Sequence, residues 1–351
     1  MDLIVNGQAH GSVAARLLQN GFDVNAMRPY VGVDGRHYIT QSNGGVATPV
    51  PLMAQNATLR RDEWIQIDTA VMAAARERLR LISDLRGSGL TFTIPNGMGK
   101  TVLESERMSD ITPATISMDP ARKSEGDRPE FDIINLPLPV IHKDFFFNAR
   151  QIATSRNNGP GIDVTSAQLA ARRVAEEAEK LALGTSGSFS YGGGTVYGLT
   201  NFPQRLTTVL THPTQSDFTG PLLVDEVLGM RQQSMNNFYF GPWVLYNSPA
   251  WDQYLDDDYS TLKGDNTLRQ RIMAINGIQD VRTLDFLTGY QLILVQQTSD
   301  VIRLVMGMDV TTLQWETEGG MRINFKVMAI MVPQIRADID DQTGIVHGVA
   351  A

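Results

Sequence analysis

One stretch of the sequence resembles part of a nucleotide-binding motif, Gly97–Thr101 (GMGKT). In a phosphate-binding loop another glycine stands five residues before the glycine of the Gly-Lys-Thr end, so that the backbone can surround the phosphates. Here that position is Ile94, and the surrounding residues do not follow a strand–loop–helix pattern. The stretch therefore predicts no nucleotide site.

Residues that could bind metals or catalyse reactions are present but not grouped. Asp256 begins an acidic run, but the window lacks the glycine and the glutamate of a calcium loop. The chain has no cysteine and no Gly-x-Ser-x-Gly elbow, so it offers no thiolate, disulfide or serine-hydrolase chemistry. The histidines form no close pair along the chain: His10, His37, His142, His212 and His347. We therefore predict a protein that is not an enzyme, with no catalytic, cofactor-binding or metal-binding residues.

The composition is that of a soluble globular protein. The 351 residues are 42% hydrophobic and 19% charged, and this length suffices for two hydrophobic cores. The formal net charge is −8, so no overall basic field attracts nucleic acid, and any contact with DNA must be local and non-specific. The start, MDLIVNGQAHG, lacks the features of a secretory signal, and no long apolar run predicts a membrane span.

The best-specified element is a helix from Thr165 to Gly184 (TSAQLAARRVAEEAEKLALG). Thr165 is a favourable N-cap residue with Gln168 placed to complete a capping box, and Gly184 suits the left-handed conformation that ends many helices. Small apolar residues recur at three- and four-residue spacing on one face, and charged residues follow the other. The alanine face predicts close packing against another backbone.

The segments before this helix differ in pattern. Residues 1–57 contain one short helical pattern, from Ser12 to Asn20, within a polar stretch that we interpret as an arm. Residues 59–87 keep helical spacing throughout, which predicts one long amphipathic helix. Residues 88–145 are strand-like pieces separated by turns and by a charged run, which predicts an extended hairpin with little core of its own. Phe145–Phe147 at its end predict a return to the core.

The segments after the helix alternate. The glycine-rich residues 186–201 predict a mobile connection. Residues 221–305 alternate helical and strand patterns, which predicts a compact α/β subdomain. The chain then returns to strands and ends in a glycine-containing coil.

The order of these parts resembles the major capsid (coat) proteins of tailed phages, whose Hong Kong ninety-seven type fold encapsulin shells share. LRRDEWIQID (59–68) is similar to the helix before the hairpin in encapsulin-like coats, and PLPVIHKDFFF (137–147) to the return toward the long spine helix. GPWVL (241–245) and GMD (307–309) fall where similar shells carry Gly-Pro before a strand and Gly-x-Asp before the closing sheet. The resemblance covers residues 59 to 340.

The resemblance implies an α+β fold of the tailed-phage major capsid type. Its parts would be an N-terminal arm (1–58), a helix leading into the loop (59–87), an extended β-hairpin loop (88–140), a peripheral domain (141–207 and 306–351) with a spine helix at 165–183, and an α/β axial domain (208–305).

Such a protein is structural and self-assembles, as hexamers and pentamers, into an icosahedral head shell around double-stranded phage DNA. We expect assembly in the bacterial host cytoplasm and a final place in the virion. A separate scaffolding protein, a portal and decoration proteins are the further partners that such a shell implies. The long leader and the charged hairpin favour a phage coat over an encapsulin-type compartment with a protein cargo, which is the alternative; a soluble enzyme of unknown reaction is a third reading.

The hairpin is the predicted contact between subunits. We expect strand-type hydrogen bonds and many ion pairs, each exposed pair contributing only about 0–1 kcal/mol. The predicted contact residues are charged: Lys100, Arg107, Arg122, Lys123, Glu125, Asp127, Arg128 and Glu130. Some coats of this fold instead crosslink a loop lysine covalently to a neighbour, and Lys100 and Lys123 are the only lysines of this loop. The sequence identifies no asparagine or carboxylate to assist such a bond, so non-covalent contact is the prediction.

Overall fold

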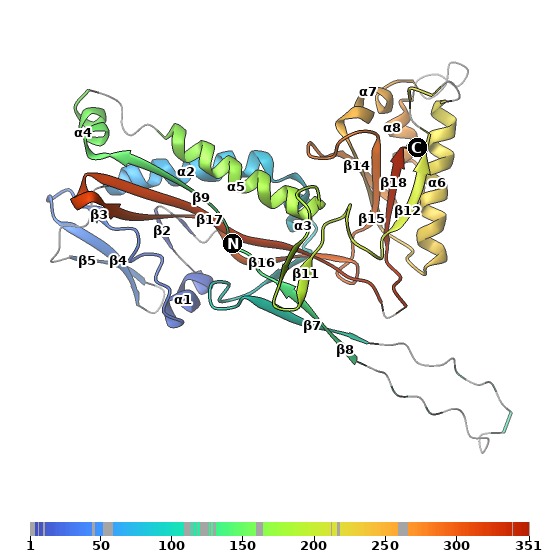
Figure 1. Cartoon of the computed structure of the whole chain (residues 1–351), viewed down its shortest axis with the longest axis horizontal. Coiled ribbons are helices and arrows are strands. Elements are labelled where there is room, and N and C mark those ends of the chain that lie inside the picture. The colour runs from blue at the N-terminus through green and yellow to red at the C-terminus, as the bar shows by residue number, and fades with distance from the viewer. Residues whose placement is uncertain are drawn as a thin grey trace. The chain divides into compact units, whose positions relative to one another are not determined.

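The computed structural model describes residues 4–5, 7–9, 11–43, 46–51, 59–108, 114, 116, 118–119, 126, 128, 131–158, 164–211, 213–215, 218–258, 266–338 and 340–350. The chain divides into two compact units (Figure 1). Unit 1 comprises Met1–Thr101, Leu138–Ala182 and Leu304–Pro333; unit 2 comprises Val102–Pro137, Leu183–Arg303 and Gln334–Ala351. Among the residues described, none of the helices combines the length and apolarity of a membrane-crossing segment.

Unit 1 is built on a four-stranded sheet in the order β6-β16-β17-β9. The strands are β6 (Thr91–Thr93), β16 (Ile302–Thr317), β17 (Arg322–Ile335) and β9 (Ile141–Asn148). β6 runs parallel to β16, and β9 runs antiparallel to β17. Helices α2 (Arg61–Arg78) and α5 (Thr165–Leu183) lie along this sheet, and α4 (Ala149–Asn158) follows β9 (Figure 1).

Aromatic side chains join α2 to the sheet. Phe325 stacks on Phe145 with ring centroids 5.0 Å apart, and Phe147 and Trp64 meet Phe325 edge to face at 5.6 and 5.9 Å. Phe146, by contrast, is 48% exposed. The prediction that all three phenylalanines return to the core is therefore wrong for Phe146, because successive residues of a strand point to opposite faces.

The spine helix forms over the predicted residues. α5 spans Thr165–Leu183, and Gly184 after it has a φ of +87°. The alanine face is buried, as Ala167, Ala171 and Ala182 show. Close packing of this face against other parts of unit 1 follows from the small side chains.

The helix expected over residues 59–87 is two helices, α2 and α3 (Arg80–Gly87). Leu79 leaves the helical conformation, with φ −86° and ψ 79°. A tertiary contact accounts for the break, since the Glu179 carboxylate of α5 accepts hydrogen bonds from the N–H groups of Leu81 (2.6 Å) and Ile82 (3.4 Å). The periodicity of α2 and α3 alone carries no sign of this partner.

The N-terminal stretch holds more structure than an arm with one helix. It contains β1 (Ile4–Val5), β2 (Gln8–Ala9), α1 (Gly11–Gln19) and a three-stranded antiparallel sheet of β3 (Tyr30–Val31), β4 (His37–Asn43) and β5 (Val46–Pro51). Arg28 is 3% exposed, pairs with Asp68 of α2 and donates to the Thr312 carbonyl at 2.7 Å. Its guanidinium also lies 4.1 Å from the centre of the Trp64 ring. This part of the stretch is thus packed into unit 1.

Unit 2 holds a five-stranded sheet in the order β12-β18-β15-β13-β14. The strands are β12 (Leu206–Leu210), β18 (Ile345–Ala350), β15 (Gln291–Gln296), β13 (Trp243–Asn247) and β14 (Ile278–Thr283). The helices are α6 (Gly220–Asn236), α7 (Asp252–Leu255), entered through a 3-10 turn at Pro249–Trp251, and α8 (Leu268–Met273). The alternation predicted for residues 221–305 is present, and the helices share one core with the sheet.

The end of the chain is a strand of this sheet. β18 pairs in parallel with β12 and antiparallel with β15, so the expected terminal coil is wrong. A Cβ at Gly348 would lie 2.6 Å from the Leu210 side chain. Glycine at this position therefore permits close packing. Residues 102–137, 183–207 and 334–351 all fall in unit 2, and the division into arm, loop, peripheral and axial domains stays a prediction.

Candidate assembly interface

The extended hairpin forms at its base, where β7 (Val102–Met108) pairs antiparallel with β8 (Phe131–Pro137). Five of the predicted contact residues lie outside the described residues: Arg122, Lys123, Glu125, Asp127 and Glu130. Of the others, Lys100 is exposed before β7 and Arg128 is exposed before β8. The described part of the chain therefore does not bring the predicted residues together as one group.

Arg107, the third described contact residue, is engaged within its own chain. Its guanidinium pairs with Asp132 across the hairpin at 3.3 Å and with Asp341 at 3.1 Å, and it also donates to the Asp338 carbonyl at 3.1 Å. The Asp338 carboxylate in turn accepts from the Gln342 N–H at 2.7 Å. Arg107 thus fastens the base of the hairpin to the turn at residues 338–342, a contact between segments too distant in sequence for a local pattern to reveal.

A second contact holds the opposite side of the hairpin base. The glycine-rich segment is a small hairpin, β10 (Phe189–Tyr191) with β11 (Gly194–Val196), and not merely a mobile connection. A Cβ at Gly194 would lie 2.0 Å from the Asn135 carbonyl oxygen, and Asn135 donates to the Gly192 carbonyl at 3.3 Å. The glycines therefore allow this turn to lie directly on β8.

The pairing register divides the β7–β8 hairpin into two faces. Leu103 and Leu136 are opposite each other, are both 6% exposed, and lie on the same face as Arg107, on which Ile134 is 42% exposed. On the other face Phe131 is 61% and Ile133 64% exposed, with Glu104 and Glu106 exposed on the paired strand. We name these last four residues the outer hairpin face. Strand alternation in FDIINLP could have revealed it.

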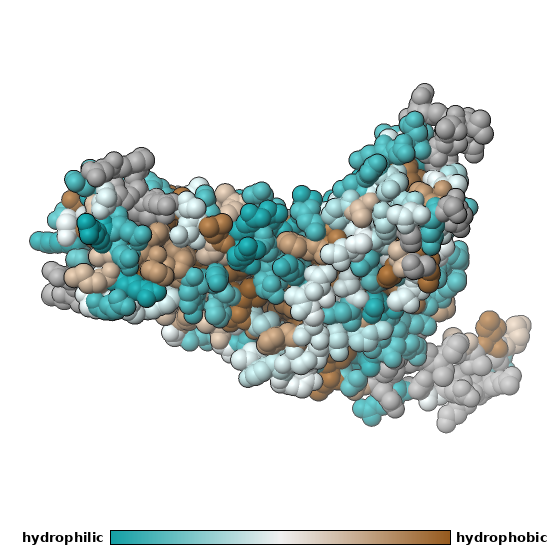
Figure 2. Space-filling model, turned by 45° about the horizontal axis from the view of Figure 1, so that its top comes forward, coloured by the Kyte–Doolittle hydropathy of each residue, from teal (hydrophilic) through white to brown (hydrophobic). Residues whose placement is uncertain are grey.

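Further exposed apolar residues follow along the same excursion. Ile116 and Met118 have full exposure. Figure 2 shows hydrophobic surface on this extended part of the chain, at its lower right. An exposed apolar group on an element with little core marks an interaction surface more often than a catalytic one.

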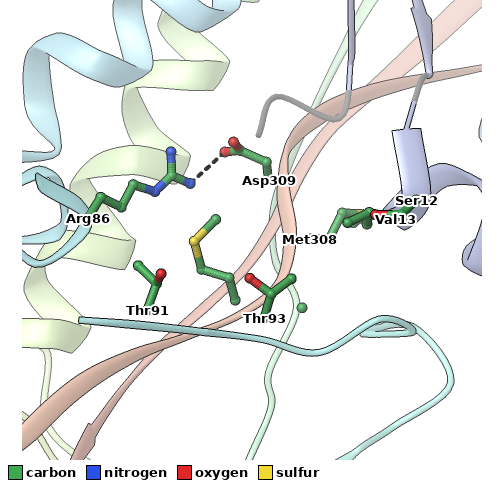
Figure 3. A pocket seen from close by; sticks show the side chains of 9 residues that line it. Ser12, Val13, Arg86, Thr91, Thr93, Met308 and Asp309 are labelled. Atoms are coloured by element: carbon green, nitrogen blue, oxygen red, sulfur yellow. Dashed lines mark hydrogen bonds and ion pairs between the residues drawn. The ribbon is translucent and has the colours of Figure 1, made fainter. Parts of the chain in front are cut away.

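A cavity of about 370 Å³ lies in unit 1 between α1, α3, β6 and β16. Its lining residues are Ser12, Val13, Arg86, Thr91, Thr93, Met306, Gly307, Met308 and Asp309. In Figure 3 the Arg86 guanidinium points at the Asp309 carboxylate, 3.0 Å away, so these opposite charges compensate each other. No group of three or more histidine, aspartate or glutamate side chains suited to a metal occurs among the described residues.

Gly97, the first glycine of the GMGKT stretch, has a packing role in unit 1. A Cβ at Gly97 would lie 2.4 Å from the backbone of Gly307. The two glycines thus allow the backbones of the loop and of β16 to touch. This close approach accounts for the glycine without any bound phosphate.

The exposed side of α5 carries a cluster of arginines. Arg172 and Arg173 each donate to the Glu176 carboxylate at 2.8 Å, and Arg78 of α2 lies 3.8 Å from it. Although burial raises the pKa of Glu176, the hydrogen bonds from Arg172 and Arg173 hold that pKa below its usual value. Three guanidinium groups therefore surround one ionised carboxylate.

Solved structures with the same fold are shell proteins. A virus-like particle from Pyrococcus furiosus matches with a TM-score of 0.58 at 15% identity, over 81% of this chain and 98% of its own. The capsid of Myoviridae phage XM1 matches with a TM-score of 0.56 at 8% identity, over 73% and 88%. The capsid of a native GTA particle matches with a TM-score of 0.51 at 12% identity, over 88% of this chain and 97% of its own. The chain thus has the α+β fold that phage capsids and encapsulins share.

Sequence comparison points in the same direction. The type 1 encapsulin shell protein EncA of Myxococcus xanthus (strain DK1622) is 24% identical over 292 residues, which are 79% of this chain and 90% of EncA. A sequence model described as a family of unknown function (DUF6260) matches residues 53–348. The match extends from just before α2 into β18 and so includes elements of both compact units, but not β1–β5 or α1.

Proposed function

The chain belongs to the DUF6260 family, and we propose that its function is to build an icosahedral shell as the major capsid protein around a double-stranded DNA phage genome. The observation that carries this proposal is the fold, which both compact units contribute to and which the XM1 capsid shares over 88% of its length. A structural role also agrees with the exposed outer hairpin face. Fixed surfaces that recur in many copies, and not a reacting group, would then perform the function.

Within such a shell the β7–β8 hairpin is the proposed contact between subunits. Its base is fastened by Arg107 on one side and by Gly194 on the other. Many weak contacts repeated over symmetric copies add up to a stable shell. The charged residues 120–130 are part of this proposed contact, and crosslinking through Lys100 or Lys123 is the less favoured route.

The partners follow from the same proposal. The first is the chain itself, in hexamers and pentamers assembled in a bacterial host cytoplasm before the shell becomes part of the virion. Packaged DNA would be contacted weakly and without sequence preference, because the net charge is −8 and Arg78 of the first long helix is already paired with Glu176. A separate scaffolding protein, a portal and decoration proteins complete the proposed set.

The second candidate is an encapsulin-type compartment around a protein cargo. The identity of 24% to EncA favours it. Both candidates require closed shells, and they differ in the contents of those shells.

Electron microscopy of the purified chain, with and without the products of neighbouring genes, tests shell formation. Closed particles or capsomers are expected, and a monodisperse monomer under every assembly condition would contradict both candidates. Native particles holding long double-stranded DNA would support the capsid, whereas a co-purifying protein cargo would support the compartment. Sequence-selective DNA binding by the isolated chain at physiological salt would contradict the proposed non-specific contact.

A deletion of residues 120–130 tests the role of the hairpin. We expect a folded, soluble subunit that no longer closes into stable shells. Normal shells from the deletion variant would reject the hairpin contact. Ladders of covalent multimers on a denaturing gel of mature particles would instead favour the lysine crosslink.

A further inference from the structure

We propose that the aromatic turn after helix α6, with Phe238 and Phe240 at its surface, anchors a contact with a second copy of this chain in the assembled shell. The inference rests on the proposed shell formation. It adds a contact made by unit 2, separate from the β7–β8 hairpin, and it gives a physical reason for the strained backbone at Phe238.

The turn carries three consecutive aromatic residues, of which the middle one is anchored in unit 2. Phe238 is 76% exposed and Phe240 is 64% exposed. The hydroxyl of Tyr239 between them donates to the Gln342 carbonyl at 3.1 Å, and a Cβ at Gly344 would lie 3.1 Å from the Tyr239 ring. The anchored tyrosine therefore keeps the two phenylalanines in outward positions.

Hydrogen bonds hold the backbone of the turn at both of its ends. At the start, the N–H of Tyr239 donates to the Ser234 carbonyl at 3.1 Å, which ties the turn to the last turn of α6 (Figure 1). At the end, the N–H of Gly241 donates to the side chain of Gln296 at 2.8 Å. An anchored backbone presents the two rings in one arrangement, which lowers the entropy lost when they dock.

The backbone at Phe238 is in the left-handed region, with a φ of 64°. Phe238 follows Asn237, the C-cap of α6, and this is the position where helices most often have a glycine. Two other described residues that are not glycine have a positive φ, Glu318 and Asp341. Aspartate adopts this conformation more readily than a bulky aromatic residue does. Because such strain is concentrated at functional sites, we connect the Phe238 ring with function.

The size of the exposed surface indicates the kind of contact. An aromatic side chain buries about 150–250 Å² when it is fully covered, so the two partly exposed rings offer roughly 300 Å² together. A stable pair of proteins needs about 800 Å² from each partner. The turn alone is therefore too small to hold a dimer in solution. It suits one of several contacts between the same two copies, as a closed shell provides.

A second copy is the partner that the proposed shell supplies. Each phenyl ring leaves water by packing on an apolar surface, and in a shell built from one kind of chain that surface belongs to another copy. The contact then recurs at every equivalent position of the shell. The loss of one ring should therefore reduce assembly without preventing the subunit from folding.

Photocrosslinking tests which surface the turn contacts. Phe240→p-benzoylphenylalanine replaces one ring by a photoreactive aromatic group. The isotopically labelled variant is mixed with an excess of the unlabelled, unmodified chain, so that particles form even if the variant assembles poorly by itself. After irradiation, mass spectrometry identifies the crosslinked peptides. We expect crosslinks between labelled and unlabelled chains in assembled particles, and none in the same mixture kept as free subunits, which is the control.

The outcomes separate this contact from the proposed function. Absence of particles from the unmodified chain would reject shell formation and the contact with it. Particles that contain the variant but give no crosslink between copies would reject only the contact. Crosslinks confined to single labelled chains would also reject it, since the ring would then pack on its own subunit.

Substitution of the rings provides an independent readout. Phe238→Gly removes the strain together with the ring, so it should raise the thermal unfolding midpoint of the isolated subunit by about 2–4 °C and yet lower the yield of particles about tenfold, as expected for one buried phenyl ring. Phe240→Ala should lower the yield similarly with an unchanged midpoint. Asn236→Ala, at an exposed position on α6, is the matched control and should assemble normally. Undiminished yields from both phenylalanine variants, or a lower midpoint for Phe238→Gly, would overturn the proposal.

Discussion

The carboxylate of Glu179 lies 2.6 Å from the backbone nitrogen of Leu81, so a buried side chain of α5 begins helix α3. Glu179 is 1% exposed and also accepts from the Ile82 N–H. Burial raises the pKa of this carboxyl to about 7, against the opposing effect of the two N–H groups. The contact is therefore both a helix cap and a group that titrates near neutral pH.

Removal of the cap should destabilise the subunit. Glu179→Ala leaves two buried N–H groups without their acceptor, and we expect a loss of about 1–3 kcal/mol in the free energy of unfolding. Glu179→Gln keeps an acceptor oxygen and should lose less. Urea denaturation of the isolated subunits measures both, and an unchanged midpoint for Glu179→Ala would count against the capping role.

The titration of Glu179 should appear in the pH dependence of stability. Its folded-state pKa of about 7 lies above the ordinary value of 4.5, so the folded state binds the proton more tightly than the unfolded state does. The resulting stabilisation is present below pH 4.5 and is lost as the pH rises through 7, by at most about 3 kcal/mol. The difference in unfolding free energy between the natural chain and Glu179→Gln should fall over this range; a constant difference would contradict the assignment.

The titration of His347 should change the stability of the subunit with pH in the opposite direction. It lies between Arg205, whose Nε donates to Nδ1 at 3.3 Å, and Gln291, 3.2 Å from Nε2. Burial, and then the charge of Arg205, lower the pKa of His347 to about 4 from 6.5. Its contribution to stability is therefore complete above pH 6.5 and is lost as the pH falls toward 4. Thermal unfolding of the natural chain and of His347→Gln between these pH values checks this, and parallel pH profiles would show that His347 does not titrate there.

The contact between Gly97 and Gly307 should not tolerate a side chain. Gly97→Ala would place a Cβ 2.4 Å from the backbone of Gly307, and we expect a loss of about 1–3 kcal/mol from the forced shift. Gly229→Ala is the matched control, because a Cβ in the middle of α6 meets nothing within 4 Å. That control should gain about 0.5–1 kcal/mol from helix propensity. Equal unfolding midpoints for the two variants would refute the steric argument.

Arg107 should stabilise the base of the hairpin in the isolated subunit as well as in the assembled one. Its partners Asp132 and Asp341 are 58% and 62% exposed, so Arg107→Ala should cost only about 1 kcal/mol or less. Backbone hydrogen exchange at β7 and β8 should nevertheless become faster, since the base of the hairpin loses its tether. Lys100→Ala is the control, and exchange rates that change only after assembly would assign Arg107 to the contact between subunits instead.

Local patterns predicted those elements whose stabilisation is mostly local. The capping signals and the alanine spacing of α5 all lie within residues 165–184, and the structure has the helix at Thr165–Leu183. The strands of the hairpin base were also foreseen, although the charged residues chosen for the contact left out Phe131 and Ile133. The alternation of residues along β8 places Phe131 and Ile133 on one face of the strand. The prediction instead followed the charged residues of the loop.

Long-range contacts decided what the patterns missed. The helical spacing of residues 59–87 continues through Leu79, and the break there depends on Glu179, about a hundred residues further along the chain. From the sequence, Arg107 is predicted to be an exposed charge of the loop. In the structure it pairs with Asp341, which is more than two hundred residues away along the chain. The final strand is too short and glycine-containing to be distinguished from coil, and only its two neighbours β12 and β15 stabilise it.

The sequence by itself indicated the capped helix α5, the strands of the hairpin base and the alternation of helices and strands in residues 221–305, because capping and periodicity act over a few neighbouring residues. It also contains no recognisable catalytic motif. The α+β class followed from the resemblance of the chain's parts to phage coat proteins. The tertiary structure decided that Arg107 pairs with Asp341 and that three arginines surround one carboxylate. Those properties depend on hydrogen bonds and burial between residues far apart in the chain, whose free energies exist only once the chain has folded.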